Sequence, residues 1–556
     1  MRKPICIIKF IICLILTVAL SVTSSPLQYT TNAATKNTSS KNQIVIKSYS
    51  PKAKKSYSAG SKFSVSVTTK TASKVYATFN GKKIKLEIKN QTSNGYSKFT
   101  GSFTLPSGNT KAKNLGKIKF RVKYKGKSKT FYSKHITCKK DKNVSLSDVN
   151  YVKVKKGVIT QIVSYQAETF TGKKNDTSKP YNNYLPQGTL DYGTTKYETL
   201  ERDGKKLKIL TLRCGKKVYK YRYDKPTNKK VTVARQFKGY LPDHNEISVD
   251  DFYENSSHTI LSLNTLWKAP FDFKLKNQKY NSGFSVDKVT YKYIDITFCY
   301  ATVFDGELQI PENNPLFSKA KLIKNKYDYT LRLYLKEKGA FYGWDAYYDS
   351  YGRLCFAFLN PAKITKANNK YGADLTGVKI LIDVGHGGID GGAVASKNSK
   401  KDEAYYNLRL AKKLASELLS TGATVYMTRT TDKTSSTDEK MKILKQLKPN
   451  YCIAIHHDHN LRSSLNGMGS YYYYPFSKTA ASYVSKQTAK TKIYKKKSFK
   501  WHYYFMGRSS VCPVVLTENG YMSNSYDYKK IKNSKITQKK AVALTKGIVQ
   551  YFKSIQ

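Results

Sequence analysis

Acidic side chains are scarce in this chain of 556 residues, because Asp and Glu total 37 against 99 Lys and Arg. The formal net charge of +62 makes the surface repel itself unless it meets a polyanion. The imbalance therefore predicts a polyanionic partner. A codon bias toward Lys, Asn, Ile and Tyr is the alternative explanation of the same composition.

Cysteine is also sparse, and no two cysteines form a CxxC pair. This spacing excludes a structural zinc knuckle and a dense disulfide framework. We expect isolated buried thiols, with pairing among six cysteines as the alternative. Beyond Cys6 and Cys13 near the N-terminus, these six are Cys138, Cys214, Cys299, Cys355, Cys452 and Cys512.

Long apolar runs are absent except near the N-terminus. Residues 10–22 form a thirteen-residue apolar run behind basic residues at 2, 3 and 9, and no charge follows until Lys36. This arrangement predicts a signal peptide and leader over residues 1–34. The run is shorter than the ~20 residues of a membrane-spanning helix, which makes an uncleaved anchor the weaker alternative. The expected mature protein is secreted and has no stable membrane insertion.

The length exceeds what one hydrophobic core supports, and an apolar content of 40% excludes a mainly disordered chain. Short alternating runs such as 63–67 and 118–124 predict an Ig-like β-sandwich over residues 36–145, which we expect to be a spacer. Residues 146–366 predict a mostly β region, with two subdomains divided near Trp267 to Asp287 as one option. Its aromatic segment 341–348 favours a β core over a sugar-stacking surface.

From Gly377 onward, strand patterns alternate with helical ones. Residues 378–383, 424–428, 451–456, 469–474 and 513–517 read as strands, and 403–420 and 537–552 read as amphipathic helices. Ser436 to Glu439 forms a capping box that opens another helix. The predicted fold class is therefore multidomain: N-terminal all-β, β-sandwich-like modules, then a C-terminal α/β domain over 377–556 with a mainly parallel sheet flanked by helices.

Histidine is rare, yet five of the eight histidines fall in this last domain. Three predicted strands end at or next to a polar residue, namely His386, His456 and Glu518. Because the carboxyl ends of strands form the ligand crevice of an open α/β sheet, these side chains can converge. Two imidazoles and a carboxylate can hold a catalytic zinc ion. Glu518 then suits the acid/base that moves the proton of the attacking water.

Four separated motifs in this domain resemble the zinc-dependent N-acetylmuramoyl-L-alanine amidases of the amidase 3 type. They are 382–388 (IDVGHGG), Glu403 with Asn407, 454–456 (AIH) and 515–524 (VLTENGYMSN). The resemblance implies that His386, Glu403 and His456 ligate Zn²⁺ and that Glu518 is the catalytic acid/base. It also implies hydrolysis of the amide between N-acetylmuramic acid and L-alanine. Taken alone, Glu403 would be read as a favourable charge at a helix start.

The sequence departs from the family pattern at two places, with Val384 in place of Pro and His457-Asp458 in place of a small residue and Asn. On an extended strand His457 points away from the face that His456 uses. We therefore expect Asn407, His457 and Asp458 to support the metal ligands from behind, with a surface position as the alternative for His457 and His459. His502 is expected to be an ordinary packed or surface histidine.

These features predict a secreted, wall-associated peptidoglycan hydrolase of a Gram-positive-type bacterium. Its expected partners are peptidoglycan and anionic wall polymers, which would explain the positive charge. The alternative is a catalytically inactive wall-binding protein with an amidase-like domain. Nucleic-acid binding is disfavoured because a signal peptide is predicted, arginine is scarce and no nucleic-acid module is recognisable.

Overall fold

The computed structural model describes residues 43–70, 72, 74–91, 94–106, 112–139, 157–165, 167–170, 184–202, 204–281, 285–396 and 399–556. The predicted signal peptide and leader, residues 1–34, lie outside these residues. Within the described part of the chain, no helix is long and apolar enough to cross a membrane.

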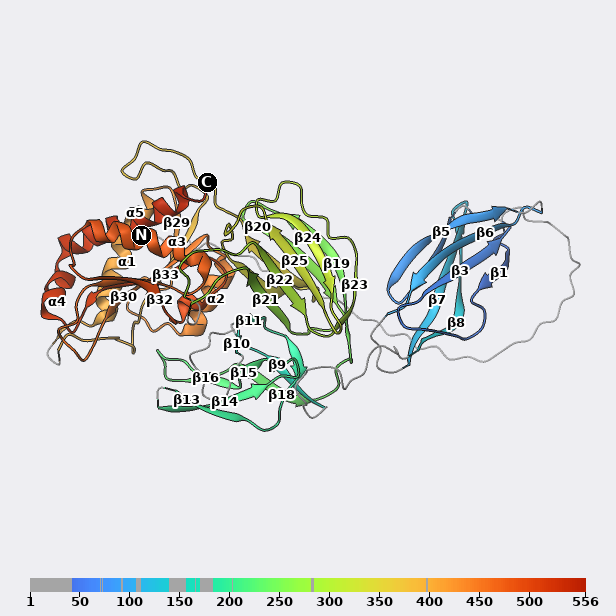
Figure 1. The fold of residues 1–556 in the computed structure, drawn as a ribbon, viewed down its shortest axis with the longest axis horizontal. Coiled ribbons are helices and arrows are strands. Elements are labelled where there is room, and N and C mark those ends of the chain that lie inside the picture. The colour runs from blue at the N-terminus through green and yellow to red at the C-terminus, as the bar shows by residue number, and fades with distance from the viewer. Residues whose placement is uncertain are drawn as a thin grey trace, which may run out of the picture.

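The first described part is one hydrogen-bonded sheet of eight strands in the order β1-β3-β6-β5-β4-β7-β8-β2 (Figure 1). Its strands are β1 (Ile46–Ser50), β2 (Lys55–Tyr57), β3 (Lys62–Thr69), β4 (Lys74–Phe79), β5 (Lys82–Gln91), β6 (Ser97–Thr104), β7 (Lys113–Tyr124) and β8 (Lys127–Cys138). Strand β5 pairs with β4 through its first half and with β6 through its second half. Alternate residues of β3, β4 and β7 are buried in a common core. The β-sandwich class of this part stays a prediction.

The next part forms three small sheets. Their strands are β9 (Val158–Ile162), β10 (Ala167–Phe170), β11 (Tyr184–Leu185), β12 (Leu190–Tyr192), β13 (Glu198–Arg202), β14 (Lys205–Thr211), β15 (Lys217–Tyr219), β16 (Tyr221–Tyr223), β17 (Lys230–Thr232) and β18 (Ala234–Lys238). Strands β16 and β17 pair only with each other among the described residues, so they form a separate hairpin.

Two larger sheets follow, in the orders β23-β19-β20-β27-β26 and β21-β22-β25-β24. Their strands are β19 (Asn245–Glu254), β20 (His258–Thr265), β21 (Phe271–Lys276), β22 (Tyr293–Phe298), β23 (Ala301–Asp305), β24 (Phe317–Lys324), β25 (Tyr329–Leu335), β26 (Trp344–Tyr348) and β27 (Leu354–Leu359). Both sheets contribute to one aromatic-rich core that includes Phe341 and Trp344. The chain passes from the three small sheets to these two between β18 and β19, and from one of the two to the other between β20 and β21. The division of residues 146–366 into two subdomains near 267–287 stays a prediction.

The C-terminal domain has a six-stranded sheet in the order β29-β28-β30-β33-β31-β32, flanked by helices (Figure 1). Its elements are β28 (Lys379–Val384), α1 (Glu403–Leu419), β29 (Thr424–Met427), α2 (Thr437–Leu447), β30 (Tyr451–Asp458), β31 (Met468–Tyr472), α3 (Pro475–Lys490), β32 (Lys497–Trp501), β33 (Val514–Tyr521), α4 (Ser525–Lys532) and α5 (Ser534–Lys553). The sheet is mixed, because β31 runs antiparallel to β33 while the other neighbours are parallel.

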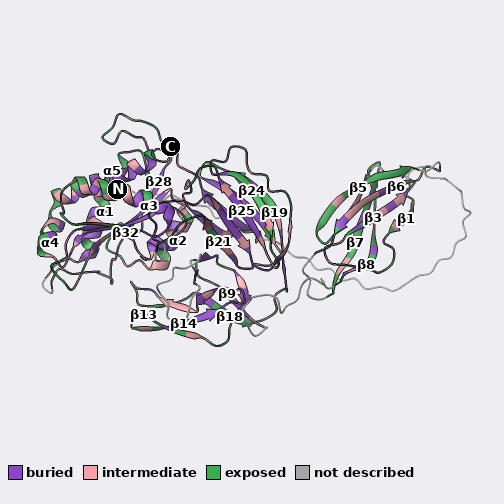
Figure 2. Ribbon diagram, in the orientation of Figure 1, coloured by how far each residue is buried: buried purple, intermediate pink, exposed green. Residues whose placement is uncertain are grey.

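The two faces of this sheet carry different helices. Ile453 and Ile455 of β30 pack in a core with α1, α3 and α5, whereas Cys452 and Ala454 pack with Met441 and Leu444 of α2. Figure 2 shows that the strands of this sheet are largely buried. The alternation assigns His456 and His457 to opposite faces, with His456 on the α2 face.

The C-terminal domain packs directly on the β region before it. Tyr473, Tyr474 and Phe476 belong to the same apolar core as β19–β27. A buried ion pair joins Arg508 Nη1 to Glu168 Oε2 at 2.6 Å. The six cysteines among the described residues are free thiols, and of these only Cys214 is incompletely buried.

Candidate metal centre

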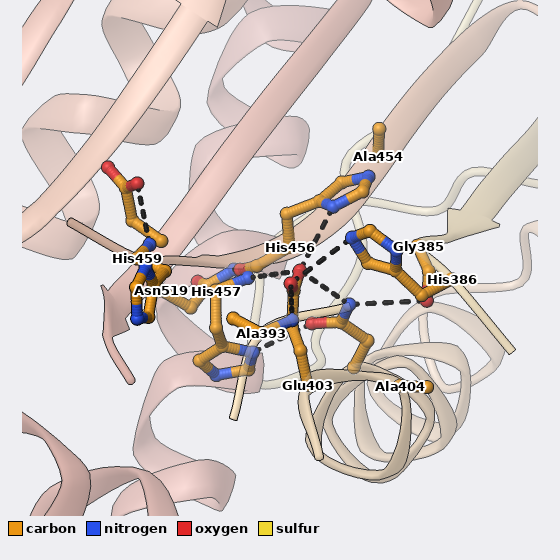
Figure 3. Close-up of polar contacts among 12 residues, drawn as sticks. Gly385, His386, Ala393, Glu403, Ala404, Ala454, His456, His457, His459 and Asn519 are labelled. Atoms are coloured by element: carbon orange, nitrogen blue, oxygen red, sulfur yellow. Dashed lines mark hydrogen bonds and ion pairs between the residues drawn. The ribbon is translucent and has the colours of Figure 1, made fainter. Parts of the chain in front are cut away.

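Three side chains predicted from separate motifs meet at one end of the C-terminal sheet. His386 follows β28, Glu403 is the first residue of α1, and His456 lies in β30. Their ligand atoms all lie within 4.8 Å of one another. Figure 3 shows the Glu403 carboxylate facing both imidazoles, with a dashed contact to each. Glu403 Oε2 lies 3.1 Å from His386 Nε2, and Oε1 lies 3.1 Å from His456 Nδ1.

Glu403 is held by the start of α1. The Asp402 side chain caps the helix by accepting a hydrogen bond from the Tyr405 amide. Glu403 is 4% exposed and accepts hydrogen bonds from the amides of Ala393 and His457 at 3.0 and 3.1 Å. Burial raises its pKa, but hydrogen bonds from the two histidines outweigh burial and hold that pKa well below its usual range. The side chain is therefore a buried anion within the site.

His386 adopts a backbone conformation that is unusual for a residue other than glycine, with φ of 60°. Its Nδ1 lies 2.8 Å from Asp390 Oδ2, which leaves Nε2 directed at Glu403. Burial lowers the pKa of His386, but the two carboxylates outweigh burial and raise it to about 9. Asp390 was not predicted from the sequence. A carboxylate four residues beyond a glycine-flanked histidine is the signal that could have indicated it.

Two glycines leave the space that the site needs. A Cβ atom on Gly385 would lie 2.4 Å from His456 Cε1, and a Cβ on Gly392 would lie 2.6 Å from Glu403 Oε2. Gly392 also has φ of 69°, a conformation that side chains other than glycine rarely adopt. The glycine-rich segment after β28 therefore allows the imidazoles and the carboxylate to approach each other.

A buried amide supports the three side chains from behind. Asn407 lies one turn after Glu403 and donates hydrogen bonds to Glu403 Oε1 at 3.0 Å and to the Gly385 carbonyl at 3.2 Å. Its Oδ1 lies 2.7 Å from His457 Nδ1. His457 is 4% exposed, so the surface alternative for this residue is wrong. On the α1 face of the sheet, Asn407 thus holds Glu403 directly, and the His457 side chain holds Asn407.

The remaining predicted residues lie farther out. Asp458 is half-buried and accepts a hydrogen bond from the His459 amide at 2.8 Å, and His459 is exposed. His502 is half-buried and stacks on Tyr504 with ring centroids 4.0 Å apart. None of these three side chains belongs to the group of candidate metal ligands.

Glu518 lies next to His456 in the sheet. The two residues are register partners on the parallel strands β30 and β33. Glu518 is 7% exposed, and its Oε2 has no hydrogen-bond partner among the described residues. Burial, with help from the charges of Glu403 and Asp458, raises the pKa of Glu518 well above its usual range, and Lys225 opposes this shift. The buried setting therefore disfavours the ionised form of this carboxyl group.

The donor set fits a zinc ion. Two imidazole nitrogens and one carboxylate oxygen are ligands that zinc binds in proteins, and Asp390 orients the ring of His386 through its other nitrogen. A buried carboxyl group, that of Glu518, lies beside this set as the register partner of His456. The arrangement can therefore support metal-assisted hydrolysis.

Comparison with known proteins agrees with the motifs. Residues 380–550 match the family described as N-acetylmuramoyl-L-alanine amidase (Amidase_3). The probable cell wall amidase LytH of Staphylococcus epidermidis is 34% identical over 180 residues, which cover 32% of this chain and 60% of that protein. LytH of Staphylococcus aureus is 33% identical over 189 residues, which cover 34% of this chain and 63% of that protein. The chain thus spans 60–63% of the length of these curated relatives.

Solved structures of amidases also align with the C-terminal domain. The catalytic domain of CwlV, an N-acetylmuramoyl-L-alanine amidase from Bacillus (Paenibacillus) polymyxa var. colistinus, aligns with 28% identity and a TM-score of 0.31, covering 32% of this chain and 98% of that one. The family match at residues 380–550 covers the segment that carries His386, Glu403, His456 and Glu518. The chain therefore carries a domain of the N-acetylmuramoyl-L-alanine amidase family at residues 380–550.

Proposed function

We propose that this protein is a secreted, zinc-dependent N-acetylmuramoyl-L-alanine amidase that hydrolyses the amide between N-acetylmuramic acid and the L-alanine of the peptidoglycan stem peptide. His386, Glu403 and His456 hold the zinc ion, and Glu518 is the catalytic acid/base. The observation that carries the proposal is the meeting of two imidazoles and a buried carboxylate within 4.8 Å, with Glu518 in register beside His456.

The chain's own residues account for the proton transfers. When bound, zinc supplies Lewis acidity toward a carbonyl oxygen and a water molecule. The Glu518 carboxylate takes the proton of the attacking water and then delivers it to the leaving nitrogen of L-alanine. The raised pKa of Glu518 suits the first step, because a carboxylate whose pKa is raised is a stronger base toward the proton of water. Asn407 and Asp390 keep Glu403 and His386 in place by hydrogen bonding.

Secretion and wall association complete the proposal. They rest on the apolar run at residues 10–22 behind basic residues and on the net charge of +62, which suits anionic wall polymers. Relatives named cell wall amidases are consistent with this location.

Digestion of purified peptidoglycan tests the reaction. The full secreted chain, loaded with zinc, should release new L-alanine amino groups without new reducing sugars. New reducing sugars would indicate a glycosidase and contradict the proposal. If neither product forms while purified protein holds one zinc ion per chain, the domain binds metal without this activity, and the inactive wall-binding alternative takes its place.

A further inference from the structure

The hairpin of β16 and β17 reaches from the middle β region to helix α2 of the amidase domain. Arg222 Nη1 donates a hydrogen bond to Thr437 Oγ1 at 2.8 Å, and the same guanidinium forms an ion pair with Asp438. The buried Asp224 carboxylate accepts a hydrogen bond from the Thr437 amide at 2.8 Å. Because Thr437 is the first residue of α2, the hairpin is fixed on the N-terminal end of this helix.

That end of α2 lies at the rim of the candidate metal centre. The loop from β29 to α2 supplies Asp432 and Thr434, whose oxygens accept hydrogen bonds from the amides of Gly388 and Ile389 at 2.8 and 3.0 Å. Gly388 and Ile389 directly follow the His386 segment. In addition, the side-chain alternation of β33 assigns Glu518 to the same face of the sheet as Leu516, which packs with α2. The hairpin is therefore anchored to α2, the helix that covers the face of the sheet to which Glu518 belongs.

A second contact fixes the hairpin to the segment before β33. The Arg222 guanidinium lies 5.2 Å from the centroid of the Phe505 ring. The preceding residue, Tyr504, packs against Tyr471 with ring centroids 5.3 Å apart, and the charge of Glu518 acts on both tyrosines. The hairpin thus contacts two segments near Glu518: the start of α2 and Phe505, the residue that follows Tyr504.

Lys225 stands at the turn of this anchored hairpin, directly after Asp224. Its side chain is exposed, and its ammonium group acts electrostatically on Glu518. Within the described part of the chain, Lys225 Nζ makes no hydrogen bond or ion pair. The hairpin therefore places an exposed cation next to the N-terminal end of α2, within electrostatic range of the candidate acid/base, and no carboxylate of the described protein neutralises it by contact.

We propose that Lys225 is a specificity residue contributed by the middle β region, and that it binds the first free carboxylate of the stem peptide beyond the scissile amide. This inference rests on the proposed amidase function. If Glu518 acts at the amide of L-alanine, the nearest free negative charge on the peptide side is the α-carboxylate of the second, glutamate-derived residue. An ammonium group near Glu518 can attract that carboxylate, whereas an amidated substrate offers no charge.

The test uses two soluble muramyl tripeptides that differ only in whether the α-carboxyl of the second residue is free or amidated. Wild type, K225M and the control K229M, whose exposed lysine lies in the same hairpin, are compared as full chains. For K225M we expect KM to rise about fivefold on the free-carboxylate tripeptide, with kcat unchanged and no effect on the amidated one. K229M should match wild type on both substrates. Thermal unfolding checks that each variant is folded.

Two results would overturn the inference. One is equal kinetics of K225M and K229M, and the other is an equal loss on both tripeptides, which would mean that Lys225 acts through Glu518 rather than on the substrate. Failure of the proposed function looks different, because wild type would then release L-alanine amino groups from neither tripeptide. In that case calorimetric binding of the two tripeptides to wild type and K225M decides the inference: weaker binding of the free-carboxylate tripeptide alone supports it, and unchanged binding contradicts it.

Discussion

His456 and Glu518 stand side by side as register partners on the parallel strands β30 and β33, and the register shifts directly after them, so that Asp458 pairs with Tyr521. Both side chains belong to the face of the sheet that α2 covers, whereas His457 lies on the opposite face against Asn407. The end of β30 thus places the candidate ligand His456 on one face of the sheet and His457, which contacts Asn407, on the other. The irregularity thus interrupts the regular ladder at the level of the candidate site.

The substitution Glu518→Gln should abolish catalysis while leaving the fold and the metal content intact. Glutamine keeps the shape of the side chain and cannot take a proton from water, so we expect kcat to fall by about 10²–10⁴. Release of L-alanine amino groups from peptidoglycan measures the loss, and elemental analysis measures the zinc. The exposed Glu307→Gln change serves as the control and should have no effect. Full activity in E518Q would refute the assigned role.

Metal content separates the candidate ligands from the other histidines of the same domain. His386→Ala and His456→Ala each remove one of the three donors, so purified protein should hold well under one zinc ion per chain. His459→Ala removes an exposed imidazole outside the donor group and should keep wild-type zinc. Zinc loss in H459A with retention in H456A would instead place the ligand at His459.

The buried amide of Asn407 should set the affinity for zinc without being a ligand. Asn407→Ala removes the hydrogen bond to Glu403 Oε1 and leaves His457 Nδ1 without its partner. Outer partners of this kind typically contribute 10–100-fold in metal affinity, and we expect a loss of about that size in competition with a chelator. Asn90→Ala, at an exposed position of β5, should leave the affinity unchanged. An unchanged zinc affinity in N407A would show that the amides of Ala393 and His457 are sufficient to position Glu403 for metal binding.

Much of the C-terminal domain could be predicted because its signals are local. The capping box at Ser436 and Glu439 is confirmed, and α1 begins at Glu403 as expected. Helix α3 was missed because its N-cap, Tyr474, makes no side-chain capping bond and its buried positions are mostly small. The antiparallel direction of β31 was missed as well, since side-chain alternation looks the same in either direction.

Contacts between distant segments left no signal in the sequence. Glu168 and Arg508 are 340 residues apart, and neither lies in a motif. Likewise, nothing in residues 221–232 indicates that this hairpin docks on α2. The sequence therefore predicted the three candidate ligands and Glu518, and it missed both Asp390 and the contacts of the β region with the amidase domain.

The ion pair of Arg508 and Glu168 gives a prediction about how the β region and the amidase domain depend on each other. Arg508→Met leaves the buried Glu168 carboxylate without its cation, which should destabilise the protein by about 3–5 kcal/mol. The double change R508M/E168L removes both charges and should recover most of that loss. Urea unfolding followed by fluorescence measures both. Equal destabilisation by the single and double changes would mean that shape, rather than charge, dominates at this contact.

Lys540 gives a prediction about stability and pH. This α5 residue is 2% exposed, and its Nζ donates a hydrogen bond to the Asn519 carbonyl at 2.6 Å. Burial lowers its pKa from 10.5 to about 7, with Arg409 and Lys530 acting in the same direction and Asp527 opposing them. Between about pH 7 and 10.5 the unfolded chain therefore binds more protons at this site than the folded chain, so stability rises with pH by up to about 1.4 kcal/mol per pH unit.

The variant Lys540→Met isolates this contribution. Methionine cannot take up a proton, and the Asn519 carbonyl keeps the hydrogen bond from the Tyr494 hydroxyl at 2.9 Å, so the fold should tolerate the change. We expect K540M to be the more stable protein at pH 6 and wild type to gain on it steadily from pH 7 to pH 10, as measured by thermal unfolding in matched buffers. Because other titrating groups are common to both proteins, only the difference between them reports Lys540. A difference that stays constant over this range would mean that Lys540 remains charged in the fold, and that Asp527 and the Asn519 carbonyl stabilise its ammonium group more than burial opposes it.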